Sequence, residues 1–147
     1  MLAAAVEAAT SLPKAPRLLA VTVLTSMDST QLSAIGVISD PAHQVLYLGK
    51  MAQESGITGL VCSPQEVSHL RADLGQEIAL VVPGIRSSTD AIDDQARTAS
   101  ASDTLRSGAS MLVVGRPITR AADPRIAAQE ILSQMNQALA ESSSNHK

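Results

Sequence analysis

The sequence predicts an α/β protein with a parallel β-sheet, and three observations carry this prediction. Four short apolar runs rich in Leu and β-branched residues occur at residues 18–24, 58–62, 78–82 and 111–114. None of them alternates cleanly between apolar and polar residues, which is typical of strands buried on both faces. A helix-compatible segment follows each run, and alternation of this kind produces parallel strands covered by helices. We therefore expect one domain over residues 1–140, built from about four βα units, and a polar, frayed tail over residues 141–147.

Composition agrees with one folded domain and excludes several classes of function. The chain has 147 residues, of which 45% are hydrophobic and 17% charged, with a formal net charge of -3. The scattered Lys and Arg argue against a nucleic-acid partner, and no apolar run approaches the roughly 20 residues of a membrane span. The N-terminus lacks the basic region of a signal peptide, and Cys62 is the only cysteine, so we expect a cytoplasmic protein.

The Ala-rich residues 1–10 predict a first helix. The next two helices have clear start and stop signals. One begins at the Asp40 cap with Pro41 in its first position. Its inward face comprises Val45, Leu48, Met51 and Ala52, and Gly56 ends it. After the second run, residues 63–66 read Ser-Pro-Gln-Glu, a capping box with Pro at the first helical position. The buried side of that helix comprises Val67, Leu70 and Leu74, with Gly75 as its stop.

Two further helices follow the third and fourth runs. A long polar stretch, residues 86–99, separates the third run from a short helix capped by Ser100, which directs Leu105 inward and stops at Gly108. After the fourth run, Asp123 and Pro124 open a longer helix whose expected inward residues are Ala127, Ile131, Met135 and Leu139.

Ligands of parallel α/β proteins bind at the carboxyl ends of the strands. That rule indicates four places here, which are residues 24–26, Ser63, residues 83–97 and residues 115–117. Arg86 follows a Pro-Gly turn after the third run, and Arg116 follows Gly115 after the fourth. Two guanidiniums and a glycine backbone on adjacent strands suit a phosphate group, because Arg binds oxyanions through two parallel donors. The alternative is that both arginines lie in solvated surface turns.

Five motifs in this order resemble one family. They are residues 19–27 (Leu-Ala-Val-Thr-Val-Leu-Thr-Ser-Met), 61–63 (Val-Cys-Ser), 82–86 (Val-Pro-Gly-Ile-Arg), 93–97 (Asp-Asp-Gln-Ala-Arg) and 113–119 (Val-Val-Gly-Arg-Pro-Ile-Thr). Together they resemble the C-terminal half of orotidine 5'-phosphate decarboxylase in its bacterial form, from about residue 2 to residue 139. The resemblance implies a (β/α)8 TIM-barrel fold, of which this chain would form strands 5–8, a half barrel. It also implies a homodimeric enzyme of pyrimidine biosynthesis that converts orotidine 5'-phosphate to UMP and carbon dioxide without a cofactor.

The resemblance also implies which residues bind the substrate. Thr25 matches a hydroxyl residue that contacts the pyrimidine, and Arg86 matches a ligand-binding residue beside the phosphate-side loop. Gln95 matches the glutamine of a mobile loop that closes over the nucleotide and bridges phosphate and base. Gly115 and Arg116 match the pair that holds the 5'-phosphate through a backbone N–H and a guanidinium. Such a closing loop excludes water and lets phosphate binding stabilise the transition state.

The family's catalytic motif does not occur in these 147 residues. That motif is Asp-x-Lys-x-x-Asp, preceded by a further lysine, whereas the lysines here are Lys14, Lys50 and Lys147, none in such a context. We therefore expect no catalytic residue in this chain and no decarboxylation by the chain alone. Its partner would be either a separate N-terminal half or a second copy, in a homo-oligomer.

Other residue types offer weaker chemistry. His43, His69 and His146 have no carboxylate or Cys at metal-ligand spacing, so no metal is expected. Cys62 fits a small core residue better than a nucleophile. The adjacent carboxylates Asp93 and Asp94 are expected to be solvated on a polar loop.

Three functions remain open from the sequence. The first is the substrate-binding half of the decarboxylase, and the second is a non-catalytic half barrel that self-associates and binds phosphorylated ligands. The third is another phosphate-binding barrel enzyme such as a hexulose-phosphate synthase, in which this form of the Pro-Gly-Ile-Arg and Asp-Asp-Gln motifs is not expected.

Overall fold

The sheet is parallel, as the sequence predicts, and its strands follow the chain in order. A computed structural model describes residues 1–86 and 97–144, with residues 142–144 described through their backbone alone. Within it the sheet has the order β1-β2-β3-β4, with every neighbouring pair parallel. The strands are short: β1 (Leu19–Val21), β2 (Gly59–Val61), β3 (Ala79–Val82) and β4 (Met111–Leu112).

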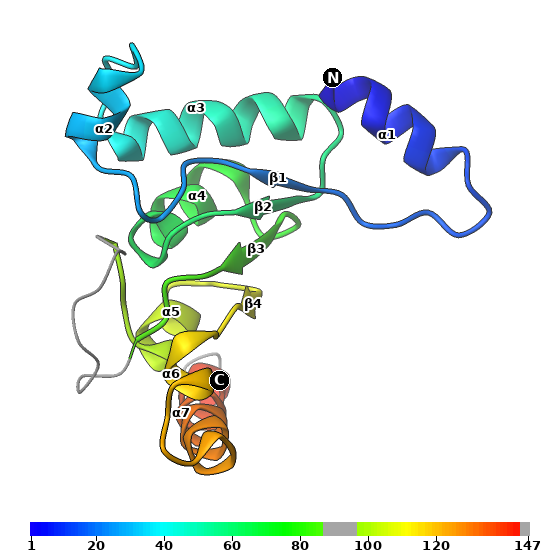
Figure 1. The fold of residues 1–147 in the computed structure, drawn as a ribbon. Coiled ribbons are helices and arrows are strands. Elements are labelled where there is room, and N and C mark those ends of the chain that lie inside the picture. Colours follow the sequence, from blue (N-terminus) through cyan, green and yellow to red (C-terminus); the bar gives the residue numbers. More distant parts are fainter. Residues whose placement is uncertain (87–96, 145–147) are drawn as a thin grey trace.

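Seven α-helices and one 3-10 turn accompany these strands in the described residues. They are α1 (Leu2–Thr10), α2 (Ser29–Ala34), α3 (Pro41–Glu54), η1 (Pro64–Glu66), α4 (Val67–Leu74), α5 (Ala101–Arg106), α6 (Arg116–Thr119) and α7 (Pro124–Ser144). Figure 1 shows the strands stepping from β1, which runs beside α3, down to β4, which lies near α5 and α7. The expected βα units are all present, and α2 and α6 are additional short helices.

The core lies between one face of the sheet and the helices. Side chains of β2 and β3 that point to this face are completely buried against α3 and α4, and they include Leu60, Leu80 and Val82. Gly49 allows α3 to approach closely, since a Cβ there would lie 3.1 Å from the Leu60 Cδ1 atom. The expected inward residue Val45 is fully buried in the same cluster.

The predicted helix starts are confirmed by their capping contacts. The Asp40 carboxylate accepts the His43 amide at 3.0 Å and approaches the His43 ring Nδ1 at 2.7 Å. The backbone hydrogen bond from His43 is the main reason that the pKa of Asp40 lies below its usual value. The Ser100 hydroxyl accepts the Asp103 amide at 3.1 Å, which caps α5. The missed helix α2 has its own capping box, formed by Asp28 and Gln31.

Two strands differ from the prediction that all four are buried on both faces. β3 is buried throughout, but Leu19 and Val21 of β1 are 44% and 59% exposed. In β4 and directly after it, Met111 and Val113 are 60% and 49% exposed. The register places these side chains on the face opposite the helices. The prediction is wrong for β1 and β4 because both are edge strands and no element of the described chain covers that face.

Of two predicted core positions in the C-terminal helices, Leu139 is exposed and Leu105 is only partly buried. In α5 the buried residues are Ala101 and Thr104, whereas Leu105 is half-buried. In α7 the buried residue is Ala138, whereas Leu139 is 53% exposed. The helix also continues to Ser144, into the segment where a frayed tail is expected, and the Glu141 carboxylate accepts the Arg106 guanidinium at 2.7 Å.

Candidate functional site

The carboxyl ends of the four strands lie side by side, which brings the predicted ligand loops to one edge of the sheet. Hydrogen bonds keep the strand ends aligned: the Thr22 amide donates to the Val61 carbonyl at 3.1 Å, and the Val113 amide donates to the Val82 carbonyl at 2.9 Å. Because β3 pairs with β4, the segments that carry Arg86 and Arg116 leave neighbouring strands. Thr25 leaves β1, two strands away from β3.

Thr25 occupies the second position of a β-turn at the end of β1. The Met27 amide donates to the Leu24 carbonyl at 2.9 Å, which closes the turn over Thr25 and Ser26. The Thr25 side chain is half-buried. Its hydroxyl can donate or accept one hydrogen bond from a ligand at the strand end.

Arg86 is half-buried rather than fully solvated. Its Nη1 atom donates to the adjacent Ile85 carbonyl at 3.0 Å, and its backbone amide donates to the Ala99 carbonyl at 3.0 Å. Its Nη2 atom is buried and has no hydrogen-bond partner in the structure as described. A buried donor without a partner is uncommon, and a guanidinium nitrogen of this kind can bind an oxyanion.

The Gly115 and Arg116 pair begins the short helix α6. The Gly115 carbonyl accepts the Ile118 amide at 2.9 Å and the Thr119 amide at 3.0 Å, so the turn is well anchored. A Cβ placed on Gly115 would meet no atom of the described residues within 4 Å, apart from its chain neighbours, so they leave this side of the backbone open. Arg116 is half-buried in the first helical position. The predicted site residue Gln95, with Asp93 and Asp94, lies outside the described residues.

A buried ionic cluster lies at the same edge of the sheet, and sequence reasoning assigned it no role. Arg97 forms an ion pair with Glu66, and both side chains are at least 90% buried. Glu66 also accepts the Ser63 amide at 3.1 Å and the Ser63 hydroxyl. The predicted capping box is therefore confirmed, but its glutamate is the buried partner of an arginine 31 residues further along. The signals in the sequence were Arg97 at the end of the 93–97 motif and Glu66 in the capping box, but nothing in the sequence paired them.

Cys62 is a core residue, as predicted. It is 1% exposed, and burial is the main cause that raises the pKa of its thiol to about 12, with the Glu66 charge contributing. Such a thiol is protonated at neutral pH and is a poor nucleophile. His43 and His69 are exposed on α3 and α4, and residues 1–86 and 97–144 contain no cluster of three metal-ligating side chains.

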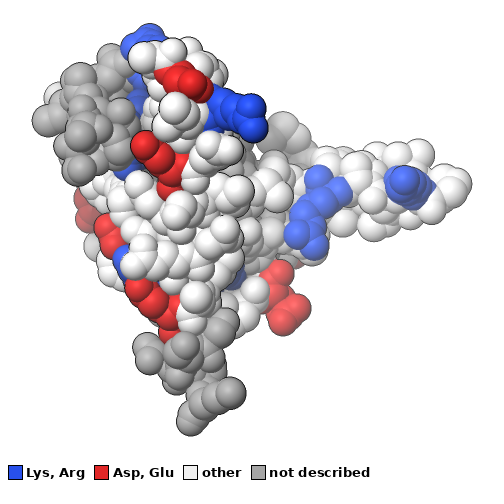
Figure 2. Space-filling model, turned by 90° about the horizontal axis from the view of Figure 1, so that it is seen from below, with Lys and Arg blue, Asp and Glu red and all other residues white. Residues whose placement is uncertain are grey.

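The face of the molecule shown in Figure 2 carries basic and acidic side chains that are interspersed around a largely uncharged centre. None of the described helices is both long and apolar enough to cross a membrane.

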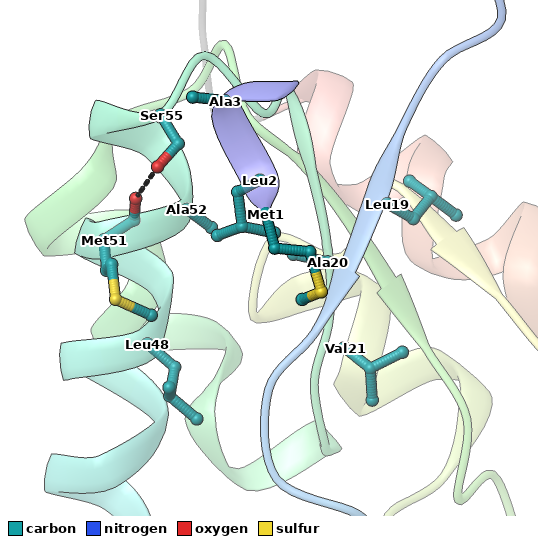
Figure 3. Close-up of a pocket in the computed structure, with 10 residues that line it drawn as sticks. All are labelled: Met1, Leu2, Ala3, Leu19, Ala20, Val21, Leu48, Met51, Ala52 and Ser55. Atoms are coloured by element: carbon teal, nitrogen blue, oxygen red, sulfur yellow. Dashed lines mark hydrogen bonds between the residues drawn. The ribbon is translucent and has the colours of Figure 1, made fainter. Parts of the chain in front are cut away.

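An apolar cavity of about 710 Å³ lies away from the strand ends, beside the edge strand β1. Figure 3 shows Met1, Leu2 and Ala20 between β1 and α3, whereas Leu19 and Val21 lie on the other side of β1. The lining is almost entirely apolar, and the Ser55 hydroxyl in it already donates to the Met51 carbonyl at 2.8 Å. This cavity offers few polar groups to a nucleotide, so we do not place the candidate site there.

Comparison with protein families identifies the family to which the chain belongs. The family described as orotidine 5'-phosphate decarboxylase / HUMPS matches residues 1–131. The chain belongs to this family. A relative named orotidine 5'-phosphate decarboxylase in Gluconobacter oxydans is 52% identical over 122 residues, which cover 83% of this chain and 52% of the relative. Another of that name in Nitrosococcus oceani is 47% identical over 136 residues, covering 92% and 59%.

Solved structures agree with the family assignment. A crystal structure of orotidine 5'-phosphate decarboxylase from Lactobacillus acidophilus matches with a TM-score of 0.68 and 39% identity, covering 84% of this chain and 50% of that one. An uncharacterised conserved protein from Geobacillus kaustophilus matches with a TM-score of 0.72 and 26% identity, covering 92% and 58%. The chain thus spans a little over half the length of the curated decarboxylase relatives described here.

Proposed function

We propose that this chain is the substrate-binding half of an orotidine 5'-phosphate decarboxylase, strands 5–8 of a TIM barrel. The observation that carries the proposal is the alignment of Arg86 and the Gly115-Arg116 pair at neighbouring strand ends in a chain of this family. The substrate would be orotidine 5'-phosphate and the product UMP, in cytoplasmic pyrimidine biosynthesis.

The phosphate would bind between the ends of β3 and β4. Among residues 1–86 and 97–144, the buried Nη2 atom of Arg86 has no hydrogen-bond partner, and the space beside the Gly115 backbone is open. The Arg116 guanidinium would pair with the phosphate oxygens, because its planar donors match their geometry. A dianion bound here gains more from two guanidiniums than from any neutral donor set of equal size.

The pyrimidine would lie toward β1, where the turn presents the half-buried Thr25 hydroxyl. Gln95, which lies outside the described residues, would bridge base and phosphate, as the resemblance implies. In this assignment the chain orients the nucleotide and excludes water, and binding energy from the phosphate serves catalysis at the base.

The proposed substrate-binding residues do not transfer a proton to the base. The resemblance assigns that step to a lysine of the Asp-x-Lys-x-x-Asp motif, which is absent from the printed sequence. We therefore propose that the chain by itself does not decarboxylate its substrate, and that a complementary N-terminal half supplies the lysine and carboxylates.

Calorimetry with UMP tests the binding assignment directly. We expect weak binding by the chain alone, and we expect Arg116→Ala to abolish it. Arg125→Ala is the matched control, since Arg125 is an exposed arginine in the first turn of α7. Tight UMP binding that Arg116→Ala leaves unchanged would refute the proposed site.

Complementation tests the division of labour. The chain would be refolded together with the N-terminal half of the Gluconobacter oxydans relative, and carbon dioxide release from orotidine 5'-phosphate would be measured. We expect activity only in the mixture, and none when the chain carries Arg116→Ala. Activity of the chain alone would contradict the proposal.

A second candidate function, a non-catalytic half barrel that self-associates, is favoured by the uncovered sheet face. Leu19, Val21, Met111 and Val113 expose an apolar surface on β1, on β4 and directly after β4. Two copies related by a two-fold axis would bring β1 of one copy beside β4 of the other and cover both faces. Such a dimer would retain the phosphate-binding residues and lack the catalytic motif.

A further inference from the structure

Arg97 joins the ends of different strands through a single buried guanidinium. It is 6% exposed, its Nη1 atom donates to Glu66, and its Nη2 atom donates to the Leu24 carbonyl at 3.0 Å. A longer contact of 3.4 Å connects Nη2 with the Val23 carbonyl. Leu24 follows β1 and Glu66 follows β2, whereas Arg97 lies between β3 and α5. The Arg97 side chain therefore connects its own segment to the ends of β1 and β2.

The Leu24 carbonyl accepts two hydrogen bonds with different consequences. One is from Arg97, and the other is from the Met27 amide at 2.9 Å, which closes the β-turn containing Thr25. The orientation of this peptide group determines where the turn begins and hence the direction of the Thr25 side chain. Arg97 therefore acts on Thr25 through the peptide that directly precedes it.

Glu66 holds the guanidinium in place from the opposite side. Its carboxylate is itself held by the amide and hydroxyl of Ser63, which is completely buried. The segment that carries Arg97 is anchored independently, because the Ala99 carbonyl accepts the Arg86 amide at 3.0 Å. The cluster thus has fixed points on three strand ends, and Arg86 is close to one of them.

A role in stability alone does not explain a buried ion pair well. Burying two charges has a large desolvation cost, and apolar residues of the same size often serve stability equally or better. The Nε atom of Arg97 is also buried without a hydrogen-bond partner in the described structure, which adds to that cost. Unlike an apolar side chain, a guanidinium has a planar set of donors that can reach a carboxylate and a carbonyl at the same time.

We propose that Arg97 is a positioning residue, which, held by Glu66, fixes the Leu24–Met27 turn and thereby presents Thr25 to the base of a bound nucleotide. The presentation of Thr25 to a base rests on the proposed function. The fixing of the turn by Arg97 does not depend on it. Arg97 touches no ligand in this assignment. It keeps the base-binding hydroxyl at a fixed place relative to the Arg86 segment.

Hydrogen exchange at Met27 is the direct test, because the Met27 amide reports the turn. The variants are Arg97→Lys, which keeps the charge but not the planar donors, and Arg97→Met with Glu66→Gln, which leaves no unpaired charge. We expect the Met27 amide to exchange about tenfold faster in both, as the loss of one charge-assisted hydrogen bond implies. Arg71→Met is the matched control, since it removes another guanidinium that bonds to several backbone carbonyls, at the opposite ends of the strands.

Ligand binding separates positioning from general loosening. UMP affinity should fall roughly tenfold in the Arg97 variants, whereas the affinity for inorganic phosphate should not change, because phosphate does not contact Thr25. Unchanged Met27 exchange, an equal rise in Arg71→Met, or equal losses for UMP and phosphate would overturn the proposal. If the unmodified chain binds no UMP while Met27 exchange responds as expected, the proposed function fails and the control of the turn by Arg97 stands.

Discussion

The Arg71 guanidinium donates to the Ser110 hydroxyl at 2.7 Å, and the same hydroxyl accepts the Leu80 amide at 3.0 Å. Arg71 also donates to the carbonyls of Gly108 and Ile78, at 2.7 and 2.6 Å. These contacts join α4 to the amino ends of β3 and β4. Arg71 therefore secures the end of the sheet opposite the candidate site, where residues of barrel folds serve stability more than function.

Replacing Arg71 should destabilise the chain without changing ligand specificity. We expect Arg71→Met to lower the free energy of unfolding by about 2 kcal/mol, because several charge-assisted hydrogen bonds are lost at a partly exposed position. Arg106→Met is the control, since its ion pairs with Asp103 and Glu141 are exposed, and it should have a smaller effect. Urea unfolding followed by circular dichroism measures both, and equal effects would contradict the structural role of Arg71.

The two serine caps should differ in strength. Ser63→Ala removes a hydroxyl that donates to the buried Glu66 carboxylate, and we expect a loss of about 2 kcal/mol. Ser100→Ala removes the cap of α5, and we expect the ordinary loss of about 1 kcal/mol. Chemical denaturation of both variants checks the difference. A Ser63→Ala loss no greater than that of Ser100→Ala would show that burial of the first cap has no energetic consequence.

The buried thiol of Cys62 should make the protein less stable in alkali. Its pKa is raised to about 12 in the folded chain, whereas an unfolded cysteine has a pKa near 9. Below pH 9 both states keep the proton and the group contributes no pH dependence. Between pH 9 and 12 only the unfolded chain loses it, so stability should fall by about 1.4 kcal/mol per pH unit.

Comparison with Cys62→Ala isolates this contribution from other groups that titrate in alkali. The difference between the two unfolding free energies should be constant below pH 9 and should change steadily above it. Iodoacetamide should modify the unmodified chain slowly at neutral pH and rapidly in urea. Fast modification of the folded chain would place the thiol in contact with solvent, contrary to the structure.

The uncovered sheet face should make the isolated chain self-associate. We expect oligomers or poor expression, because edge strands with exposed apolar side chains are templates for association. Introducing Val21→Lys with Val113→Lys should shift the chain toward monomer, since both side chains lie on that face. Ile38→Lys is the control, because Ile38 is 99% exposed and precedes α3 rather than belonging to the sheet. A monodisperse monomer that melts cooperatively, measured by sedimentation and thermal scans, would contradict this expectation.

Local signals were sufficient for most elements of the fold. The apolar runs predicted all four strands, and the Asp40 and Ser100 caps predicted where α3 and α5 begin. Capping and periodicity depend on residues three or four apart, so they are present in the sequence itself. The motifs that contain Arg86 and Gly115 are also short and local, and they indicated the family. The family is confirmed.

Exposure of the edge strands and the inward direction of some helical residues depended on distant neighbours. Val21 and Val81 are equally apolar in sequence, yet Val21 is 59% exposed and Val81 is 7% exposed, because only Val81 has a strand on each side. In α7, the packing of the helix buries Ala138 and leaves Leu139 outside.

By itself the sequence determined the order of the four strands, the caps of α3, α4 and α5, and the family. Only the tertiary structure decided that Arg97 meets Glu66 and the Leu24 carbonyl, 31 and 73 residues away in the chain. The physical reason is that pairing between charged groups depends on which strand ends become neighbours, and neighbouring strands here are joined through whole helices. The same dependence on distant partners decides which face of the sheet is covered.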